Sequence, residues 1–326
     1  MSGDAIVITG IDRHSLGEAL VKEYLGCDES PRLIGIDRVP NEDLQRHQAL
    51  TQLVFDLNPM THGAGVGAFS AKLSQVLADA VPPEGIECLI HCAGLYASGP
   101  FVEHTAESRS GVLGLNILGT TETLYAVMKL NAGCGRDNSR NFTFVLIGSF
   151  QGLYAREGRS IYAPSKSYGL DLCTSLAAGN EIARCIYIAP RLIDTPMLHR
   201  NHWVTKSGGS SSFFDSLLRG PRNRYTDIFV NCNEAVFEKE LSEAVLAEAE
   251  ALRTAMAKYR SLRAQILMGG DTLSPKVCAA AITRILVARQ VDSGVVTMSS
   301  AENGETCFSI TPYSSLDRRK MLSTGE

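Results

Sequence analysis

A serine, a tyrosine and a lysine in the middle of the chain have the types and spacing for one proton-transfer reaction. Ser149 ends the apolar run FTFVLIGS, and Tyr162 and Lys166 follow in SIYAPSK. A helix would place Tyr162 and Lys166 on one face, because residues four apart are neighbours there. An ammonium beside a phenol favours the phenolate, which predicts a pKa for Tyr162 below its usual value of about 10. Such a tyrosine can exchange a proton with an alcohol oxygen that Ser149 also hydrogen-bonds.

A second pair at the same spacing, Tyr125 and Lys129, shows that the pair alone is weak evidence. Thirteen residues before Tyr125 stands Val112, whose side chain cannot bond an oxygen. At the same distance before Tyr162 stands Ser149. We therefore take Tyr125 and Lys129 as structural residues and place the reactive site at Tyr162.

The composition is that of an ordinary globular protein. The chain has 326 residues and a net charge of −4, so no basic field would attract nucleic acid or an anionic membrane. The nine cysteines form no C-x-x-C pair, and Cys88 and Cys92 have no second pair that would complete a zinc site. We expect reduced thiols in the cytoplasm, no metal, no signal peptide and no membrane span.

Strand and helix patterns alternate along the chain, which predicts an α/β fold of the doubly wound, Rossmann type. We expect a mostly parallel seven-stranded sheet with helices on both faces, within one domain over 1–326. The predicted strands are 5–9, 33–37, 52–56, 87–91, 142–148, 184–190 and 294–298. The predicted helices are 16–25, 66–81, 106–130, one that holds Tyr162 and Lys166, and 275–288.

Residues with chemical potential recur at the carboxyl ends of these strands, where open α/β sheets bind ligands. The turn TGIDRHSLG would set a helix N-terminus against a pyrophosphate. Asp37 stands where an acid can bond both ribose hydroxyls of NAD and repel the 2′-phosphate of NADP. Arg13 or Arg38 could instead meet that phosphate, so NADP remains possible. The residues at strand ends are Gly10, Asp37, Asp56, Gly94, Ser149 and Pro190.

Together these motifs resemble the short-chain dehydrogenase/reductase family, over about 4–198 and 272–300. TGIDRHSLG resembles the TGxxxGxG turn lengthened by one residue, with Gly10 and Gly17 as its first and last glycines and Ser15 in place of the middle one. HCAG resembles the NNAG signature with both asparagines replaced, and PRLIDT resembles PGxVxT. HCAG also resembles the HxAA of the extended branch, the sugar-nucleotide epimerases and dehydratases. The thirteen-residue spacing from serine to tyrosine favours the single-domain oxidoreductase branch.

The resemblance implies a role for each site residue. Tyr162 would be the general acid/base, Ser149 would orient the substrate oxygen, and Lys166 would bind the nicotinamide ribose. Asn116 would hold a water in the proton relay. Asp56 would contact adenine, or it would cap the following turn. The implied cofactor contacts are Thr9, Gly10, Asp12, Ser15, Leu16, Gly17, Asp37, Arg38, Asp56, Leu57, Cys92, Ala93, Gly94, Tyr162, Lys166, Pro190, Ile193 and Thr195.

Other residues are harder to assign. His91 and Cys92 fit a packed strand end better than a ligand set. Arg191 replaces a family glycine, and it would either bind an anionic substrate group or point to solvent. The segment 197–272 is longer than usual and is expected to form a helical lid. Its helical pattern at 234–267 would either pack on the domain or a neighbouring subunit, or move as a lid. In the moving lid, arginines would bias the pocket toward anions: Arg200, Arg219, Arg222 and Arg224.

We therefore expect a cytoplasmic, NAD-preferring oxidoreductase that interconverts a secondary alcohol and a ketone. Its partner would be a small-molecule substrate, anionic if Arg191 takes part. The alternatives are an epimerase or dehydratase with tightly bound NAD, and a regulator that senses NAD(P) without turnover. The intact Ser-Tyr-Lys-Asn set argues against the regulator. The resemblance also implies a homodimer or homotetramer formed through the helices that contain Asn116 and Tyr162.

Overall fold

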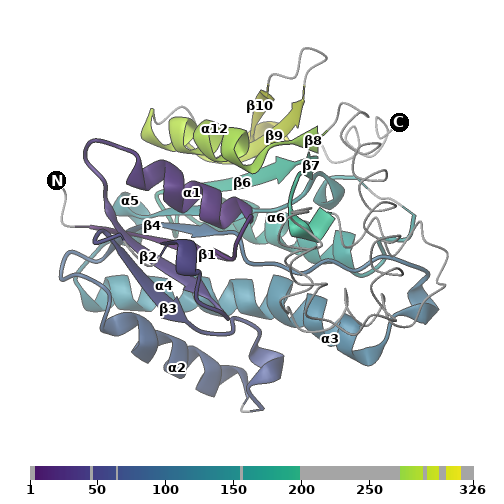
Figure 1. Ribbon diagram of the computed structural model, residues 1–326, viewed down its shortest axis with the longest axis horizontal. Helices are drawn as coiled ribbons and strands as arrows, with labels where there is room; N and C mark the ends of the chain where they lie inside the picture. Colours follow the sequence, from purple (N-terminus) through teal and green to yellow (C-terminus); the bar gives the residue numbers. More distant parts are fainter. Residues whose placement is uncertain are drawn as a thin grey trace, which may run out of the picture.

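The computed structural model describes residues 4–44, 47–63, 65–154, 157–198, 272–288, 292–300 and 306–316. These residues form a central sheet with helices on both faces (Figure 1). The helix expected at 234–267 and the four arginines of the insertion lie outside the described residues. Within the described part, no helix combines the length and apolar character needed to cross a bilayer. None of the eight cysteines described there forms a disulfide.

The sheet has eight strands in the order β10-β9-β6-β5-β4-β1-β2-β3. All neighbours pair in parallel except β10, which is antiparallel to β9. The chain turns outward in one direction from β1 and in the other from β4, so the crevice between these two strands is the topological switch point. The strands are β1 (Ala5–Thr9), β2 (Arg32–Asp37), β3 (Leu50–Val54), β4 (Ile86–His91), β5 (Thr143–Ile147), β6 (Arg184–Pro190), β9 (Gly294–Ser300) and β10 (Thr306–Pro312).

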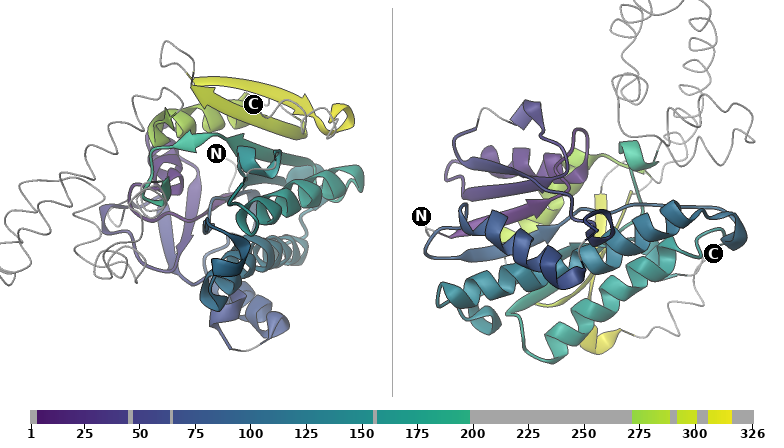
Figure 2. Two further views of the ribbon diagram at one scale, coloured as in Figure 1. Left: turned by 90° about the vertical axis from the view of Figure 1, so that its right-hand side faces the viewer. Right: turned by 90° about the horizontal axis from the view of Figure 1, so that it is seen from below.

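Strand β10 corrects the prediction of seven strands. It forms an edge hairpin with β9, at the opposite side of the sheet from β3 (Figure 2). Its residues from Cys307 on are mostly exposed, and Phe308 and Ile310 are each more than a third exposed. A half-solvated edge strand needs no continuous apolar run, and the sequence pattern of the tail therefore gave no strand signal.

Residues of each central strand alternate between two cores. In β1, Ala5 and Val7 face a core shared with α2 (Val66–Ala78), α4 (Thr120–Gly133) and α6 (Tyr162–Ala178). Ile6 and Ile8 face a second core shared with α1 (Leu16–Leu25) and α12 (Pro275–Val287). Burial on both faces explains why the strands read as continuous apolar runs. The predicted bounds of α1 are confirmed, as is the start of α12 after Ser274.

The helix expected at 106–130 is interrupted. It consists of α3 (Ala106–Leu113), a π-helical turn (Gly114–Gly119) and then α4. A Cβ atom at Gly114 would collide with the Asn58 side chain, and one at Gly119 with the carbonyl of Leu57. The absence of a side chain at both glycines thus lets the loop after β3 pack directly on the helix. Turns of this kind frequently mark functional sites, and this one carries Asn116.

A second, two-stranded sheet lies at the ends of the undescribed insertion. Strand β7 (Leu192–Ile193) pairs in parallel with β8 (Thr272–Leu273). The backbone of Asp194 also donates a 2.8 Å hydrogen bond to the carbonyl of Leu273. The two ends of the insertion, at β7 and β8, therefore lie side by side next to the carboxyl end of β6.

Candidate active site

Strand β5 and helix α6 bring Ser149, Tyr162 and Lys166 together. Ser149 follows β5 and caps a short 3-10 turn, where its Oγ accepts the backbone N–H of Gln151 at 3.1 Å. Its side chain also hydrogen-bonds that of Tyr162. The Nζ atom of Lys166 lies 5.8 Å from the centre of the Tyr162 ring. Both the tyrosine and the serine are buried, so the expected juxtaposition is present.

The pKa of Tyr162 differs from the expectation. Burial raises the pKa of its hydroxyl to about 12, although the hydrogen bond with Ser149 and the charge of Arg159 both act to lower it. Burial also lowers the pKa of Lys166 to about 8, against the opposing influence of Cys92. The prediction of an acidified phenol is wrong for this arrangement, because removing water from around the phenolate outweighs the neighbouring positive charge.

The ammonium of Lys166 lies between the end of β5 and the loop after β4. Its Nζ donates a 3.1 Å hydrogen bond to the carbonyl of Ile147 at the end of β5. On the other side, a Cβ atom added to Gly94 would lie 3.3 Å from this Nζ and 3.4 Å from Oδ1 of Asn116. A glycine at the end of the HCAG motif therefore lets the loop after β4 pass close to two predicted catalytic side chains.

Asn116 uses its side-chain amide to hold the surrounding backbone. Its Oδ1 accepts the N–H of Leu95 at 2.8 Å, and its Nδ2 donates to the carbonyl of Leu95 at 2.8 Å. The same Nδ2 donates to Oγ of Ser165 at 3.0 Å. Asn116 thus ties the loop after β4 to helix α6. Its expected role in holding a water of the relay stays a prediction.

Tyr187 is a positioning residue that the sequence pattern did not reveal. Its hydroxyl accepts the backbone N–H of Ser149 at 3.1 Å and donates to the carbonyl of Lys166 at 3.0 Å. The ring is fully buried, and Cβ atoms at Gly148 or Gly152 would collide with it. In the sequence, Tyr187 reads as one more apolar residue of strand β6, since nothing local shows that its hydroxyl reaches two other elements.

His91 is the centre of a buried hydrogen-bond chain. Oγ1 of Thr9 accepts the backbone N–H groups of Cys92 and Ala93, each at 3.1 Å, so its own hydrogen is left for Nδ1 of His91, also at 3.1 Å. Oγ1 of Thr120 donates its hydrogen to the carbonyl of Asn116 at 2.9 Å. It must therefore accept a hydrogen bond from Nε2 of His91, which lies 3.1 Å away. The network therefore assigns a neutral imidazole with its hydrogen on Nε2.

The environment of His91 supports this assignment. The side chain is fully buried, and burial together with the charge of Lys166 lowers its pKa to about 3. The prediction of a packed strand end is confirmed for His91. Its contacts link the end of β1 to the helical segment that carries Asn116.

The turn after β1 fits a bound dinucleotide. Gly10 has φ +70°, and a Cβ atom at Gly17 would collide with the carbonyl of Gly10, so the turn needs both glycines. Ser15, in place of the middle glycine, caps α1 by accepting the N–H of Glu18 at 3.0 Å. Its Oγ also donates to the carbonyl of Gly10 at 2.9 Å. The serine side chain braces the turn and leaves its backbone beside the N-terminus of α1.

Asp37 faces the same turn from the end of β2. Its Oδ2 accepts the backbone N–H of Asp12 at 3.0 Å, and its Oδ1 accepts that of Arg38 at 2.7 Å. Burial and the charge of Asp12 raise the pKa of Asp37 to about 6. A carboxylate at this position has the chemistry to accept hydrogen bonds from ribose hydroxyls.

The remaining predicted cofactor contacts lie along the same edge of the sheet. Asp56 caps the turn after β3, because its carboxylate accepts the N–H of Asn58 and the hydroxyl of Thr61, each at 3.0 Å. Contact between Asp56 and adenine stays a prediction. Thr195, after β6, donates its backbone N–H to the carbonyl of Ile193 at 2.8 Å.

Tyr96 and Arg159 lie beside Tyr162, and Arg191 lies over the ring of Phe150. The ring of Tyr96 lies 4.6 Å from that of Tyr162, and the guanidinium carbon of Arg159 lies 5.0 Å from the Tyr96 ring. The guanidinium of Arg191 lies 4.8 Å from the ring of Phe150, which follows Ser149. Tyr96 and Arg159 carried no sequence signal, because they lie in irregular loops that only the fold brings together.

The second tyrosine and lysine pair lies elsewhere on the molecule. Tyr125 is about half exposed on α4, and this agrees with the structural role assigned to it. It provides a matched control for Tyr162.

A doubly wound sheet with a glycine turn after β1, an acid after β2 and a Ser-Tyr-Lys set after β5 defines a dinucleotide-dependent class of protein. The family model for short chain dehydrogenase matches residues 4–203. The chain therefore belongs to the short chain dehydrogenase family.

Individual relatives agree with this family. An uncharacterized NAD-dependent oxidoreductase of Mycobacterium tuberculosis (strain ATCC 25618 / H37Rv) is 33% identical over 131 residues, which are 39% of this chain and 46% of that protein. The match thus spans less than half of the relative. The structure of 4-hydroxyisoleucine dehydrogenase complexed with NADH aligns with a TM-score of 0.55 at 18% identity, over 90% of this chain and 96% of the other. The ligand-free aldohexose dehydrogenase of Thermoplasma acidophilum gives a TM-score of 0.57 at 15% identity, over 90% and 91%. Of these proteins, the one from Mycobacterium tuberculosis is described as NAD-dependent, and the structure of 4-hydroxyisoleucine dehydrogenase contains NADH.

Proposed function

We propose that this protein interconverts a secondary alcohol and a ketone with NAD, and that Tyr162 is its general acid/base. The observation that carries the proposal is the convergence of Ser149, Tyr162 and Lys166 at the carboxyl end of β5. The hydrogen bond between Ser149 and Tyr162 supports it, because both hydroxyls can then reach one substrate oxygen. Lys166, with its pKa lowered to about 8, adds a group that changes charge near neutral pH.

Bound NAD supplies the hydride acceptor, and NADH the donor. The protein's own residues orient the oxygen and move the proton. Tyr162, with its pKa raised to about 12, keeps its hydrogen at neutral pH and is ready to donate it to a ketone oxygen. Ser149 donates a second hydrogen bond to that ketone oxygen. Tyr187 acts indirectly, because it holds the backbone of Ser149 and of Lys166. Asn116 hydrogen-bonds the side chain of Ser165, the neighbour of Lys166 on α6.

The test is an absorbance screen at 340 nm of alcohols and ketones with NAD, NADH, NADP and NADPH. Tyr162→Phe should lower kcat by about 10²- to 10⁴-fold, the usual contribution of a general acid/base. Tyr125→Phe should behave like the wild type. Equal activity of Tyr162→Phe and wild type would refute the proposed acid/base role. Turnover without net NADH change would favour an epimerase or dehydratase with an internal hydride cycle.

A negatively charged substrate is the second part of the proposal. The charge of Arg159 acts on the Tyr162 hydroxyl, and its Nε is buried with no acceptor among the described residues. Arg191 lies over the ring that follows Ser149. Guanidinium groups stacked on aromatic rings are held in fixed directions, which suits bidentate recognition of a carboxylate.

The screen should therefore pair each hydroxy acid with its neutral amide. Arg191→Gln and Arg159→Gln should each raise KM for the acid more than tenfold and change KM for the amide little. Lys129→Gln, on α4, is the matched loss of a positive charge away from Tyr162. If the acid and the amide are used equally well by the wild type, the anionic-substrate proposal fails while the alcohol chemistry stands.

We also propose that the protein is a cytoplasmic homodimer or homotetramer formed through the interrupted helix that contains Asn116 and through α6, which contains Tyr162. The family resemblance supports this assembly. Light scattering after size-exclusion chromatography gives the subunit number, and a monomer at micromolar concentration would contradict the proposal.

A further inference from the structure

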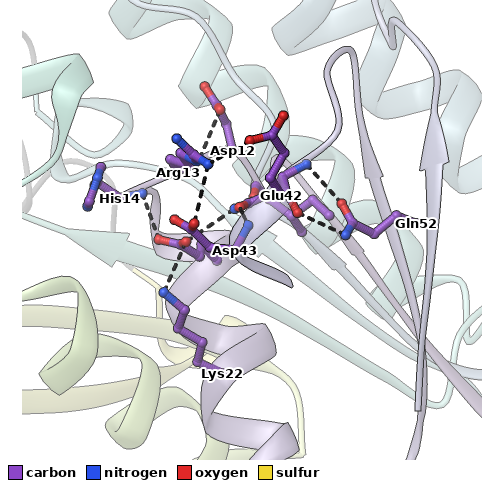
Figure 3. A network of polar contacts seen from close by, with 10 residues as sticks. Asp12, Arg13, His14, Lys22, Glu42, Asp43 and Gln52 are labelled. Carbon is purple, nitrogen blue, oxygen red and sulfur yellow. Dashed lines mark hydrogen bonds and ion pairs between the residues drawn. The ribbon is translucent and has the colours of Figure 1, made fainter. Parts of the chain in front are cut away.

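Arg13, in the turn after β1, is held by two acids from the 3-10 turn after β2. Its Nη2 lies 3.2 Å from Oε2 of Glu42 and 3.3 Å from Oδ1 of Asp43 (Figure 3). The backbone N–H of Arg13 donates to Oδ1 of Asp12 at 2.8 Å. The backbone N–H of Asp12 in turn donates to the carboxylate of Asp37 at 3.0 Å. Arg13 therefore directly follows the residue that contacts Asp37, the predicted ligand of the NAD ribose.

Buried groups fix the acids relative to the turn. Asn41, which is 1% exposed, donates through Nδ2 to the carbonyl of Ile11 at 2.8 Å and to Oε1 of Glu18 at 3.2 Å. Its Oδ1 accepts the backbone N–H of Asp43 at 3.1 Å. Gln52, from β3, exchanges two 3.0 Å hydrogen bonds with the Asn41 backbone (Figure 3).

Glu18 fixes the turn from the other side. It is 4% exposed, and its Oε2 accepts the backbone N–H of His14 at 2.7 Å. His14 has φ +60°, a left-handed conformation that this bond stabilises. Lys22 supplies the countercharge at 3.0 Å. The backbone that carries Arg13 and the backbone that carries its acidic partners are therefore joined through one buried network.

We infer that Glu42 and Asp43 keep Arg13 from serving as a 2′-phosphate ligand, and that this clamp makes the chain select NAD over NADP. An arginine in the turn whose backbone contacts Asp37 would otherwise suit the extra phosphate of NADP, since arginine binds phosphate bidentately. In this chain its charge already faces two carboxylates, and the 2′-phosphate would add two further negative charges beside Asp12 and Asp37. The inference needs only that the site binds a dinucleotide, so it can fail or hold independently of the proposed alcohol chemistry.

The test measures binding of NADH and NADPH by nicotinamide fluorescence, without any substrate. The wild type should bind NADPH at least tenfold more weakly than NADH. The double variant E42Q/D43N should tighten NADPH binding about fivefold, the size expected when exposed charge pairs are changed, and leave NADH binding within about twofold. The gain should shrink in high salt, because these side chains are exposed and salt screens their charges.

Arg13→Gln completes the comparison. If the clamp operates, adding Arg13→Gln to E42Q/D43N should remove the gain for NADPH. If the gain persists without the arginine, the acids act only through their negative charge and the clamp is refuted. A wild type that binds both cofactors equally well would also overturn the inference. Circular dichroism of each variant confirms that it is folded before binding is compared.

Discussion

His91 provides the sharpest test of the buried network, because its two hydrogen bonds and its charge can be separated. A neutral imidazole with its pKa lowered to about 3 cannot take up a proton in the folded protein at pH 5, whereas the unfolded chain, with a pKa near 6.5, can. The pKa of His91 is lower in the folded state, so the unfolded state binds more protons below pH 6.5. The free energy of unfolding therefore decreases as the pH is lowered. Between pH 7 and pH 5 this single group should cost about 2 kcal/mol.

His91→Gln should abolish this decrease in the free energy of unfolding between pH 7 and pH 5, and it should preserve both hydrogen bonds. A glutamine amide offers one acceptor for the hydroxyl of Thr9 and one donor for that of Thr120, but it does not titrate. His91→Phe should instead strand the buried hydroxyl of Thr9 and destabilise the fold by about 1 to 3 kcal/mol at pH 7. Urea unfolding followed by circular dichroism at pH 5, 6, 7 and 8 gives the free energy of unfolding of each variant.

The comparison between variants isolates His91, because Asp37 acts in the opposite direction over part of this range. Its raised pKa makes the folded state bind more protons between about pH 4 and pH 6, which adds stability as the pH falls. That contribution is common to wild type and His91→Gln and cancels in their difference. If the difference in unfolding free energy between these two proteins is the same at pH 5 and pH 7, the assignment of a permanently neutral His91 is wrong.

Two further predictions concern the cofactor site. NAD affinity measured by calorimetry should weaken as the pH falls below about 6, because Asp37 then gains a proton and loses its negative charge. Asp37→Asn should bind NAD weakly at pH 8, and its affinity should not change with pH in this range. If the variant shows the same pH profile as the wild type, Asp37 is not the cause. Gly17→Ala should abolish NAD binding and destabilise the protein, because its Cβ would collide with the carbonyl of Gly10. Gly67→Ala is the control on α2, where a Cβ meets nothing within 4 Å, and it should add up to about 1 kcal/mol of stability; equal unfolding midpoints for the two alanine variants would contradict the close approach at Gly17.

Much of the fold was predictable from the sequence because its signals are local. Continuous apolar runs marked strands buried on both faces, and the bounds of β1, β6 and α1 agree with those predicted from the pattern. The i to i+4 spacing of Tyr162 and Lys166, together with the distance back to Ser149, was enough to find the candidate site. These features depend on periodicity, which a chain carries whatever its neighbours are.

Other features were decided only by tertiary structure. The pKa of Tyr162 depends on how completely the surrounding elements exclude water, so the sequence predicted a fall where the structure gives a rise to about 12. Tyr187 orients Ser149 across the sheet, and Arg159 reaches Tyr162 through the ring of Tyr96. Residue type and spacing along the chain can nominate reactive groups. Desolvation and contacts between distant segments determine what those groups do, since both arise only when the layers pack.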